Sequence, residues 1–127
     1  MKKYKLKFEE YIRPDGKNEV REFYGSLPLK DLAKLKATIY NIEEHGLYIS
    51  ERMEWVKKID NDLYEVRSKL GSNIQRVLYF HIINNKYMLT NGFTKKTGKT
   101  PPRVIEHAKL LRREYKEIVE RENINEK

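Results

Sequence analysis

Two arginines and a cluster of lysines are the residues of this sequence best suited to chemistry. Arg67 and Arg76 stand in apolar surroundings on either side of a predicted turn, where a guanidinium needs an anionic partner or an open face. Together they offer paired hydrogen-bond donors to one phosphate group. The simpler interpretation is an edge arginine paired with a nearby carboxylate such as Glu65, and the sequence leaves both open.

The lysines lie in the segment 94–100 (TKKTGKT), between a predicted strand and a predicted helix. Its spacing does not match the Walker phosphate-binding loop, which disfavours nucleotide binding of that type. Lys95, Lys96 and Lys99 instead suit the successive phosphates of a polymer. Three hydroxyls of the same segment are available as extra donors, those of Thr94, Thr97 and Thr100. A solvated loop is the alternative.

The net charge of +8 comes from one part of the chain. No acidic residue occurs between Val66 and Ile105, and the rest of the chain is formally neutral. Such an asymmetry indicates nucleic acid, an anionic membrane or an acidic partner protein, with RNA the leading candidate. The basic residues of this window are Arg67, Lys69, Arg76, Lys86, Lys95, Lys96, Lys99 and Arg103.

His107 is the histidine nearest in sequence to the lysine segment, and it lies at the margin of an apolar helical stripe. Imidazole titrates near neutrality, so proton transfer is one interpretation and a structural contact is the other. The chain has no cysteine, which excludes disulfides and thiolate zinc sites. We therefore expect no metal and no other cofactor.

The periodicity of the sequence predicts the elements that position these residues. Alternation indicates a strand over residues 3–8, and a turn follows at 13–16. A helical hairpin comes next, with helices over 18–26 and from Pro28 to Gly46 and then a connector at 47–52. The period of two then returns over a meander of four strands, and Pro101 and Pro102 start a last helix. The predicted strands of the meander are 54–59, 63–70, 74–83 and 86–93.

This order predicts an α+β fold in which helices cover an antiparallel-rich sheet, within a single domain spanning residues 1–127. The length of the turn after residue 70 decides whether Arg67 and Arg76 lie on the same face of the sheet. A four-residue turn that sets Leu70 opposite Gln75 places Arg67 and Arg76 on one face, whereas a three-residue turn does not. The sequence shows neither a long apolar span nor the apolar run of a signal peptide, so we expect a cytoplasmic protein without membrane association.

Three segments resemble the phage-derived, Gp49-like HigB-type branch of the RelE/HigB toxin superfamily. They are 63–67 (LYEVR), 75–80 (QRVLYF) and 91–101 (NGFTKKTGKTP), and the match in order and spacing covers about half of the chain. The resemblance implies a RelE-like fold and the toxin of a type II toxin–antitoxin pair. Such toxins are metal-independent endoribonucleases that cut mRNA on the ribosome and are silenced by a cognate antitoxin, often a helix-turn-helix protein. The sequence departs from the group at Gly98, where glutamine is usual.

The resemblance also implies roles for individual residues. Catalytic roles at the scissile phosphate fall to Arg67, Arg76, Lys95 and Lys96, and contacts with the RNA backbone to Lys99, Lys69, Lys57 and Lys58. The general base and acid stay open among a perturbed lysine, His107 and a ribosomal group. Two other functions are also open, namely a ParE-like toxin that inhibits DNA gyrase and cuts no RNA, and a non-enzymatic basic adaptor. Cations that converge on one small site favour the nuclease, because an adaptor gains little from gathering them.

Overall fold

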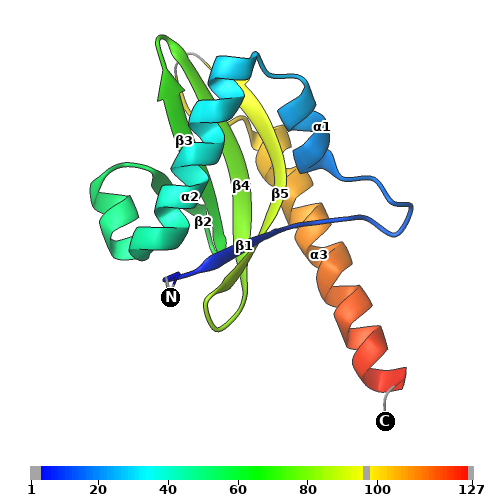
Figure 1. Ribbon diagram of the computed structural model, residues 1–127. Coiled ribbons are helices and arrows are strands. Elements are labelled where there is room, and N and C mark those ends of the chain that lie inside the picture. The colour runs from blue at the N-terminus through cyan, green and yellow to red at the C-terminus, as the bar shows by residue number, and fades with distance from the viewer. Residues whose placement is uncertain (1–3, 96–97, 126–127) are drawn as a thin grey trace.

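The computed structural model describes residues 4–95 and 98–125, which form a five-stranded mixed sheet and three helices (Figure 1). The strand order is β1-β5-β4-β3-β2, with β1 parallel to β5 and the other pairs antiparallel. The predicted α+β class is confirmed. The strands are β1 (Lys7–Glu10), β2 (Val56–Asp60), β3 (Leu63–Leu70), β4 (Asn73–Ile83) and β5 (Lys86–Lys95), and the helices are α1 (Glu19–Gly25), α2 (Leu29–Arg52) and α3 (Pro102–Asn125).

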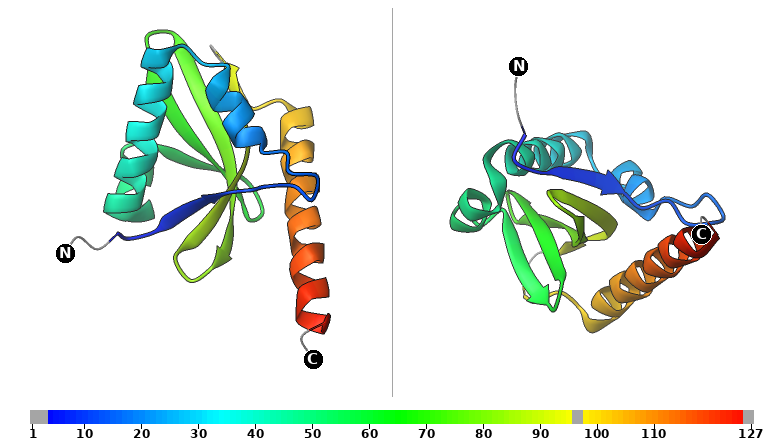
Figure 2. Two further views of the ribbon diagram at one scale, coloured as in Figure 1. Left: turned by 45° about the vertical axis from the view of Figure 1, so that its right-hand side comes forward. Right: turned by 90° about the horizontal axis from the view of Figure 1, so that it is seen from below.

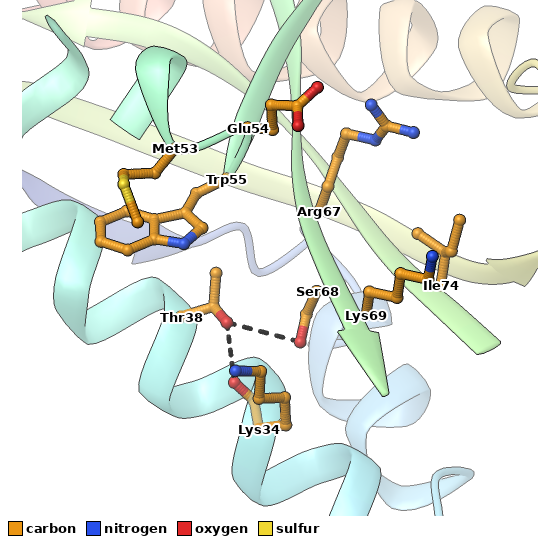
Figure 3. A pocket seen from close by; sticks show the side chains of 9 residues that line it. All are labelled: Lys34, Thr38, Met53, Glu54, Trp55, Arg67, Ser68, Lys69 and Ile74. Atoms are coloured by element: carbon orange, nitrogen blue, oxygen red, sulfur yellow. Dashed lines mark hydrogen bonds between the residues drawn. The ribbon is translucent and has the colours of Figure 1, made fainter. Parts of the chain in front are cut away.

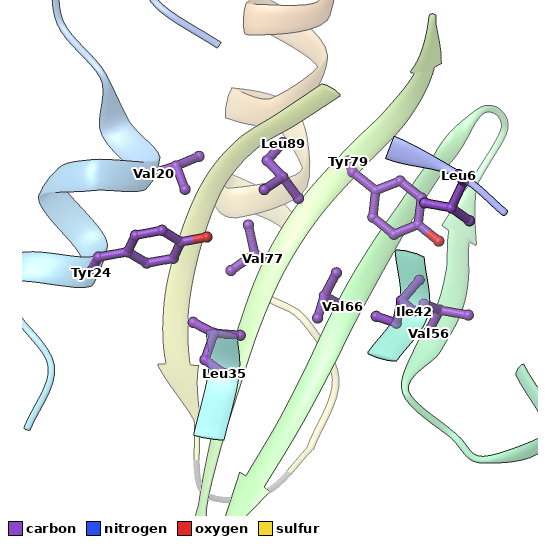
Figure 4. Close-up of a cluster of buried hydrophobic side chains, with 10 residues drawn as sticks. All are labelled: Leu6, Val20, Tyr24, Leu35, Ile42, Val56, Val66, Val77, Tyr79 and Leu89. Atoms are coloured by element: carbon purple, nitrogen blue, oxygen red, sulfur yellow. The ribbon is translucent and has the colours of Figure 1, made fainter. Parts of the chain in front are cut away.

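Helices cover both faces of the sheet (Figure 2). On one face, α1 and α2 pack over the largest hydrophobic cluster, in which Val20, Leu35 and Ile42 from the helices meet buried strand residues (Figure 4). On the other face, Leu111 of α3 packs against Phe80. No helix in the described part of the chain is both long and apolar enough to cross a membrane. Because helices cover both faces, successive residues of one strand pack alternately against α1 and α2 on one side and against α3 on the other.

The strand β1 begins four residues later than the sequence predicts. Lys7 to Glu10 pair with β5, whereas the backbone N–H groups of Lys5 and Leu6 donate to the carbonyl of Glu43 in α2. The side chain of Glu43 also accepts a hydrogen bond from the backbone N–H of Phe8, at 2.9 Å. Helix α2 thus supplies the hydrogen-bond acceptors for the backbone N–H groups at the start of β1. This contact spans more than thirty residues, so alternation alone does not reveal it.

The predicted connector at 47–52 is wrong, because α2 continues through it to Arg52. Gly46 interrupts the helix with φ 86° and ψ 173°, a left-handed conformation that glycine adopts without a steric penalty. The hydroxyl of Ser50 donates to the Gly46 carbonyl at 2.6 Å, and a helical turn resumes. Gly46 is therefore a kink and not the end of the helix.

The turn between β3 and β4 is shorter than either length considered from the sequence. Leu70 pairs with Asn73, which leaves only Gly71 and Ser72 in the turn, and Arg67 stands directly opposite Arg76. This register differs from the four-residue alternative by two positions. Because side chains alternate with a period of two, the two arginines still share a face.

Gly92 of β5 leaves room for the ring of Phe23 in α1, since a Cβ at Gly92 would overlap that ring. We expect Gly92→Ala to displace α1 and to lower the free energy of unfolding by about 1–3 kcal/mol, measured by urea denaturation. Gly25→Ala is the matched control, because a Cβ there meets no atom within 4 Å. Equal stability of the two variants would contradict the packing role.

Candidate functional site

The two arginines lie on the face of the sheet that α3 covers. Leu78 of β4 packs against Val104 and Ala108 of α3, and Arg76 is two residues before Leu78 on the same strand. Arg67 is its cross-strand partner on β3. Glu65 precedes Arg67 by two residues and therefore shares this face as well.

Glu65 and Arg76 are almost completely buried, with 1% and 3% of their surfaces exposed. Arg76 Nη1 lies 3.3 Å from Glu65 Oε1, and Arg67 Nε lies 3.7 Å from the same oxygen. The side chain of Arg67 keeps 28% of its surface exposed. The expected pairing of an arginine with Glu65 is thus present, and both arginines share this one carboxylate.

The segment that leads into α3 completes the arrangement. Arg76 donates from Nη1 to the hydroxyl of Thr100 at 3.2 Å and from Nη2 to the carbonyl of Gly98 at 2.9 Å. Thr100 in turn donates to Glu65 Oε2 at 2.6 Å. Gly98 has φ +89°, which glycine adopts readily. The guanidinium of Arg76 is therefore fixed by β3 on one side and by residues 98–100 on the other.

A cavity of about 220 Å³ opens over these residues, and we call it the arginine cavity. Its wall holds five basic side chains and one acidic one, so its formal charge is strongly positive. Arg67 Nε and Arg76 Nε are buried without a hydrogen-bond partner in the described part of the chain. Buried donors left unpaired cost about 1–3 kcal/mol each, and the Glu65 carboxylate, 3.7 Å from Arg67 Nε, offsets part of this cost. The lining residues are Lys57, Lys58, Ile59, Glu65, Arg67, Arg76, Gly98, Lys99, Thr100 and Ile105.

The other lysines that the sequence assigned to the site do not all line the arginine cavity. Lys69 and Lys95 pair with Ile74 from either side, which sets both on the face of the arginines, but neither lines the arginine cavity. Lys96, with the neighbouring Thr97, lies outside the described residues. The hydroxyl of Thr94 donates to Gln75 within the protein and not toward the cavity.

His107 lies away from the arginine cavity, in a network that joins α3 to the N-terminal part of the chain. Its Nε2 is 2.8 Å from a carboxylate oxygen of Glu19, the first residue of α1. Arg13 contacts both Glu19 and Glu114, and the hydroxyl of Tyr11 donates to Glu114. The position of His107 therefore gives it a structural partner and no contact with the cavity that holds the arginines.

This network makes a pH-dependent contribution to stability. The hydrogen bond from Arg13, opposed by partial burial and reinforced by that from Tyr11, lowers the pKa of Glu114. A carboxyl whose pKa falls on folding stabilises the fold above its unfolded pKa of about 4.3 and loses that effect as the pH drops further. We expect Glu114→Gln to be less stable than the wild type at pH 7 and its deficit to be smaller at pH 3, in urea denaturation at both pH values.

Glu120→Gln serves as the control for Glu114→Gln, because Glu120 is an exposed residue of the same helix. We expect this control to match the wild type at both pH values. A Glu114→Gln deficit that persists unchanged at pH 3 would contradict the ionic origin of the stabilisation.

Sequence reasoning placed Glu65 as one option among several and missed the contacts that Thr100 and Gly98 make with it and with Arg76. One signal was available, because Glu65 is the last acidic residue before the long acid-free window and has the spacing that sets it on the face of Arg67. The return of residues 98–100 over the sheet carries no such signal. It depends on where α3 packs.

Comparison with known proteins assigns the chain to a family. The chain matches the family described as phage derived protein Gp49-like (DUF891) over residues 22–113. The match runs from α1 into α3 and includes every residue that lines the arginine cavity. A search of curated proteins found no match. Since the family match covers well over half of the 127 residues, the chain belongs to the phage-derived Gp49-like family.

Proposed function

We propose that this protein is the toxin of a type II toxin–antitoxin pair, of the RelE/HigB kind, and that it cuts mRNA on the ribosome in the cytoplasm. The observation that carries the proposal is the arginine cavity, which two guanidiniums and three lysines line together with one buried carboxylate that both arginines share. Membership of the phage-derived Gp49-like family supports the toxin assignment. The partner is a cognate antitoxin, acidic where it meets this cationic face, which acts either by covering the arginines or by binding elsewhere and blocking entry into the ribosome.

The proposed reaction is an attack by an RNA 2′-hydroxyl on the adjacent phosphate. A bond forms between O2′ and phosphorus while the bond from phosphorus to O5′ breaks, and O5′ takes up a proton. Negative charge grows on the non-bridging oxygens, where the guanidiniums of Arg67 and Arg76 in the wall of the cavity stabilise it. The proton of the 2′-hydroxyl goes to a neutral lysine amine or to a group of the ribosome, since protonated arginines and lysines cannot accept it. The proton that O5′ takes up comes from a protonated lysine of the cavity or from the ribosome.

The buried carboxylate of Glu65 supports this chemistry although its charge is negative, like that of the substrate. Glu65 offsets one of the five cations of the cavity and holds Arg76 in a single orientation together with Thr100 and Gly98. Donors that are fixed before the substrate arrives need no reorganisation as the charge develops. The arrangement therefore suits a transition state more than tight binding of any anion.

The test is a purified translation system programmed with one mRNA. Purified protein is added to translating ribosomes and, as a matched sample, to the same mRNA without ribosomes. We expect new 5′ ends only in the translating sample, and none at a site whose 2′-hydroxyl is replaced by 2′-O-methyl, because that nucleotide lacks the nucleophile. Cleavage that is indifferent to the 2′-O-methyl group would contradict the mechanism.

Two other outcomes would replace the proposal. Growth arrest with intact mRNA and accumulating DNA breaks would assign a ParE-like action on DNA gyrase. Intact mRNA together with salt-sensitive RNA binding and no turnover would assign a binding adaptor, because contacts with phosphates weaken steeply as salt rises.

A further inference from the structure

A second cavity adjoins the arginine cavity, and Arg67 lines both (Figure 3). We call it the tryptophan cavity. Its volume of about 390 Å³ falls within the range of roughly 300–1,000 Å³ that is common for small-molecule sites. Arg67 is therefore the residue that joins the two cavities. The lining residues are Lys34, Thr38, Met53, Glu54, Trp55, Arg67, Ser68, Lys69 and Ile74.

The tryptophan cavity exists because β2 stops short of the end of β3. The last contact between them is the hydrogen bond from Arg67 N to the Trp55 carbonyl, at 2.7 Å. Before Trp55 the chain turns toward α2 through Glu54, which has φ 61°, and the backbone N–H of Trp55 donates to Ser50. The end of β3 consequently has α2 beside it on this edge, and the two meet where the Thr38 and Ser68 hydroxyls are 3.4 Å apart.

The walls of this cavity combine two kinds of chemistry. Lys34 of α2 and Lys69 of β3 are exposed lysines in its wall, and both suit phosphate. Trp55 and Met53 supply an aromatic and a thioether surface from the segment that joins α2 to β2. Stacking of a base on an aromatic side chain contributes about 1–3 kcal/mol. Cations beside an indole match a nucleotide better than they match an acidic peptide, which leaves the indole unused.

The indole of Trp55 is held in place by packing against other side chains of the protein. It packs against the large hydrophobic cluster under α2, and its ring centroid lies 6.1 Å from that of His45. The carboxylate of Glu54 also lines the cavity, and it points away from the indole, on the side of Arg67 (Figure 3). A fixed ring loses little conformational entropy when a base stacks on it.

We propose that the tryptophan cavity binds the nucleotide next to the cleaved phosphate, with its base on Trp55 and its outer phosphate between Lys34 and Lys69. The inference rests on the proposed nuclease function and adds a subsite to it. Arg67 is the shared residue that sets the spacing between the reacting phosphate and this nucleotide.

The chain contains one tryptophan, so its fluorescence reports on this cavity alone. The probe is an RNA tetranucleotide with 2′-O-methyl groups throughout, which cannot be cut. We expect it to change the emission of Trp55, whereas inorganic phosphate, which fits the arginine cavity without reaching the indole, should leave the emission unchanged. Binding measured by anisotropy of the labelled tetranucleotide should weaken about tenfold in Trp55→Leu.

Exposed lysine variants keep the test independent of folding. Lys34→Ala and Lys69→Ala should each weaken tetranucleotide binding several-fold and reduce its salt dependence, because each loses a phosphate contact. Lys30→Ala is the matched control, since Lys30 is exposed one turn earlier on α2 and lines neither cavity. We expect this control to bind as the wild type does.

Three results would overturn the subsite. One is tetranucleotide binding that depends on Arg76 but not on Lys34, Lys69 or Trp55, and this would leave the nuclease proposal standing. Another is the absence of any tetranucleotide binding, in which case mRNA cleavage on ribosomes still decides the nuclease separately. The third is tighter binding of an oligoglutamate peptide than of the tetranucleotide, which would assign the cavity to a protein partner.

Discussion

Replacing Arg76 with alanine should slow mRNA cleavage on translating ribosomes about 100- to 1,000-fold, the usual effect of removing one fixed donor from a developing oxyanion. Arg76 is buried beside Glu65 and held by Thr100 and Gly98, so its guanidinium has one orientation. A water molecule that replaces the guanidinium in Arg76→Ala lacks this fixed orientation, so it cannot stabilise the developing charge to the same extent. The measurement is the rate at which new 5′ ends appear in the reconstituted translation system.

Two further variants separate geometry from charge at this position. Arg76→Lys keeps the charge but loses the planar set of donors that reaches Gly98 and Thr100, so we expect it to stay well below wild-type activity. Arg103→Ala removes an exposed arginine that does not line the arginine cavity, and cleavage should be unchanged. Urea denaturation of each variant shows that it is folded. Undiminished cleavage by both Arg76→Ala and Arg67→Ala would overturn the assignment.

The sequence predicted the shared face of the arginines for a reason that survives errors in detail. Any shift of register by two residues preserves the face of every side chain, so the turn at Gly71 and Ser72 changes only which residues are opposite each other. The helix boundaries were less predictable. Gly46 carries the usual signal for a helix end, yet the hydrogen bond from Ser50 and the packing of the following turn let α2 resume.

The contacts that complete the arginine cavity could not be predicted, because they join segments that are distant in the sequence. Thr100 reaches Glu65 across 35 positions, and it does so only because α3 brings the preceding segment back over the sheet. The tryptophan cavity arises in the same way, where α2 lies beside β3. Periodicity describes which face a residue occupies, but it does not describe which distant segment covers that face.

A large effect on stability should come from Glu65→Ala. This change leaves Arg76 buried with no other carboxylate of residues 4–95 and 98–125 within ion-pair distance, and it removes the acceptor of the Thr100 hydroxyl. Breaking one side of a buried ion pair costs about 3–5 kcal/mol, a large share of the roughly 5–15 kcal/mol that holds a domain folded. The measurement is the urea midpoint, with Glu117→Gln, an exposed acidic residue of α3, as the control.

Glu65→Gln distinguishes positioning from simple charge balance. The amide still accepts a hydrogen bond from Thr100 or Arg76, so the loss of stability should be smaller than in Glu65→Ala, while the cavity gains net positive charge. If Glu65 positions the arginines, inorganic phosphate should bind Glu65→Gln more tightly than the wild type while mRNA cleavage falls, because attraction increases as the fixed orientation of Arg76 is lost. Tighter phosphate binding together with faster cleavage would instead show that Glu65 only dilutes the positive charge of the cavity.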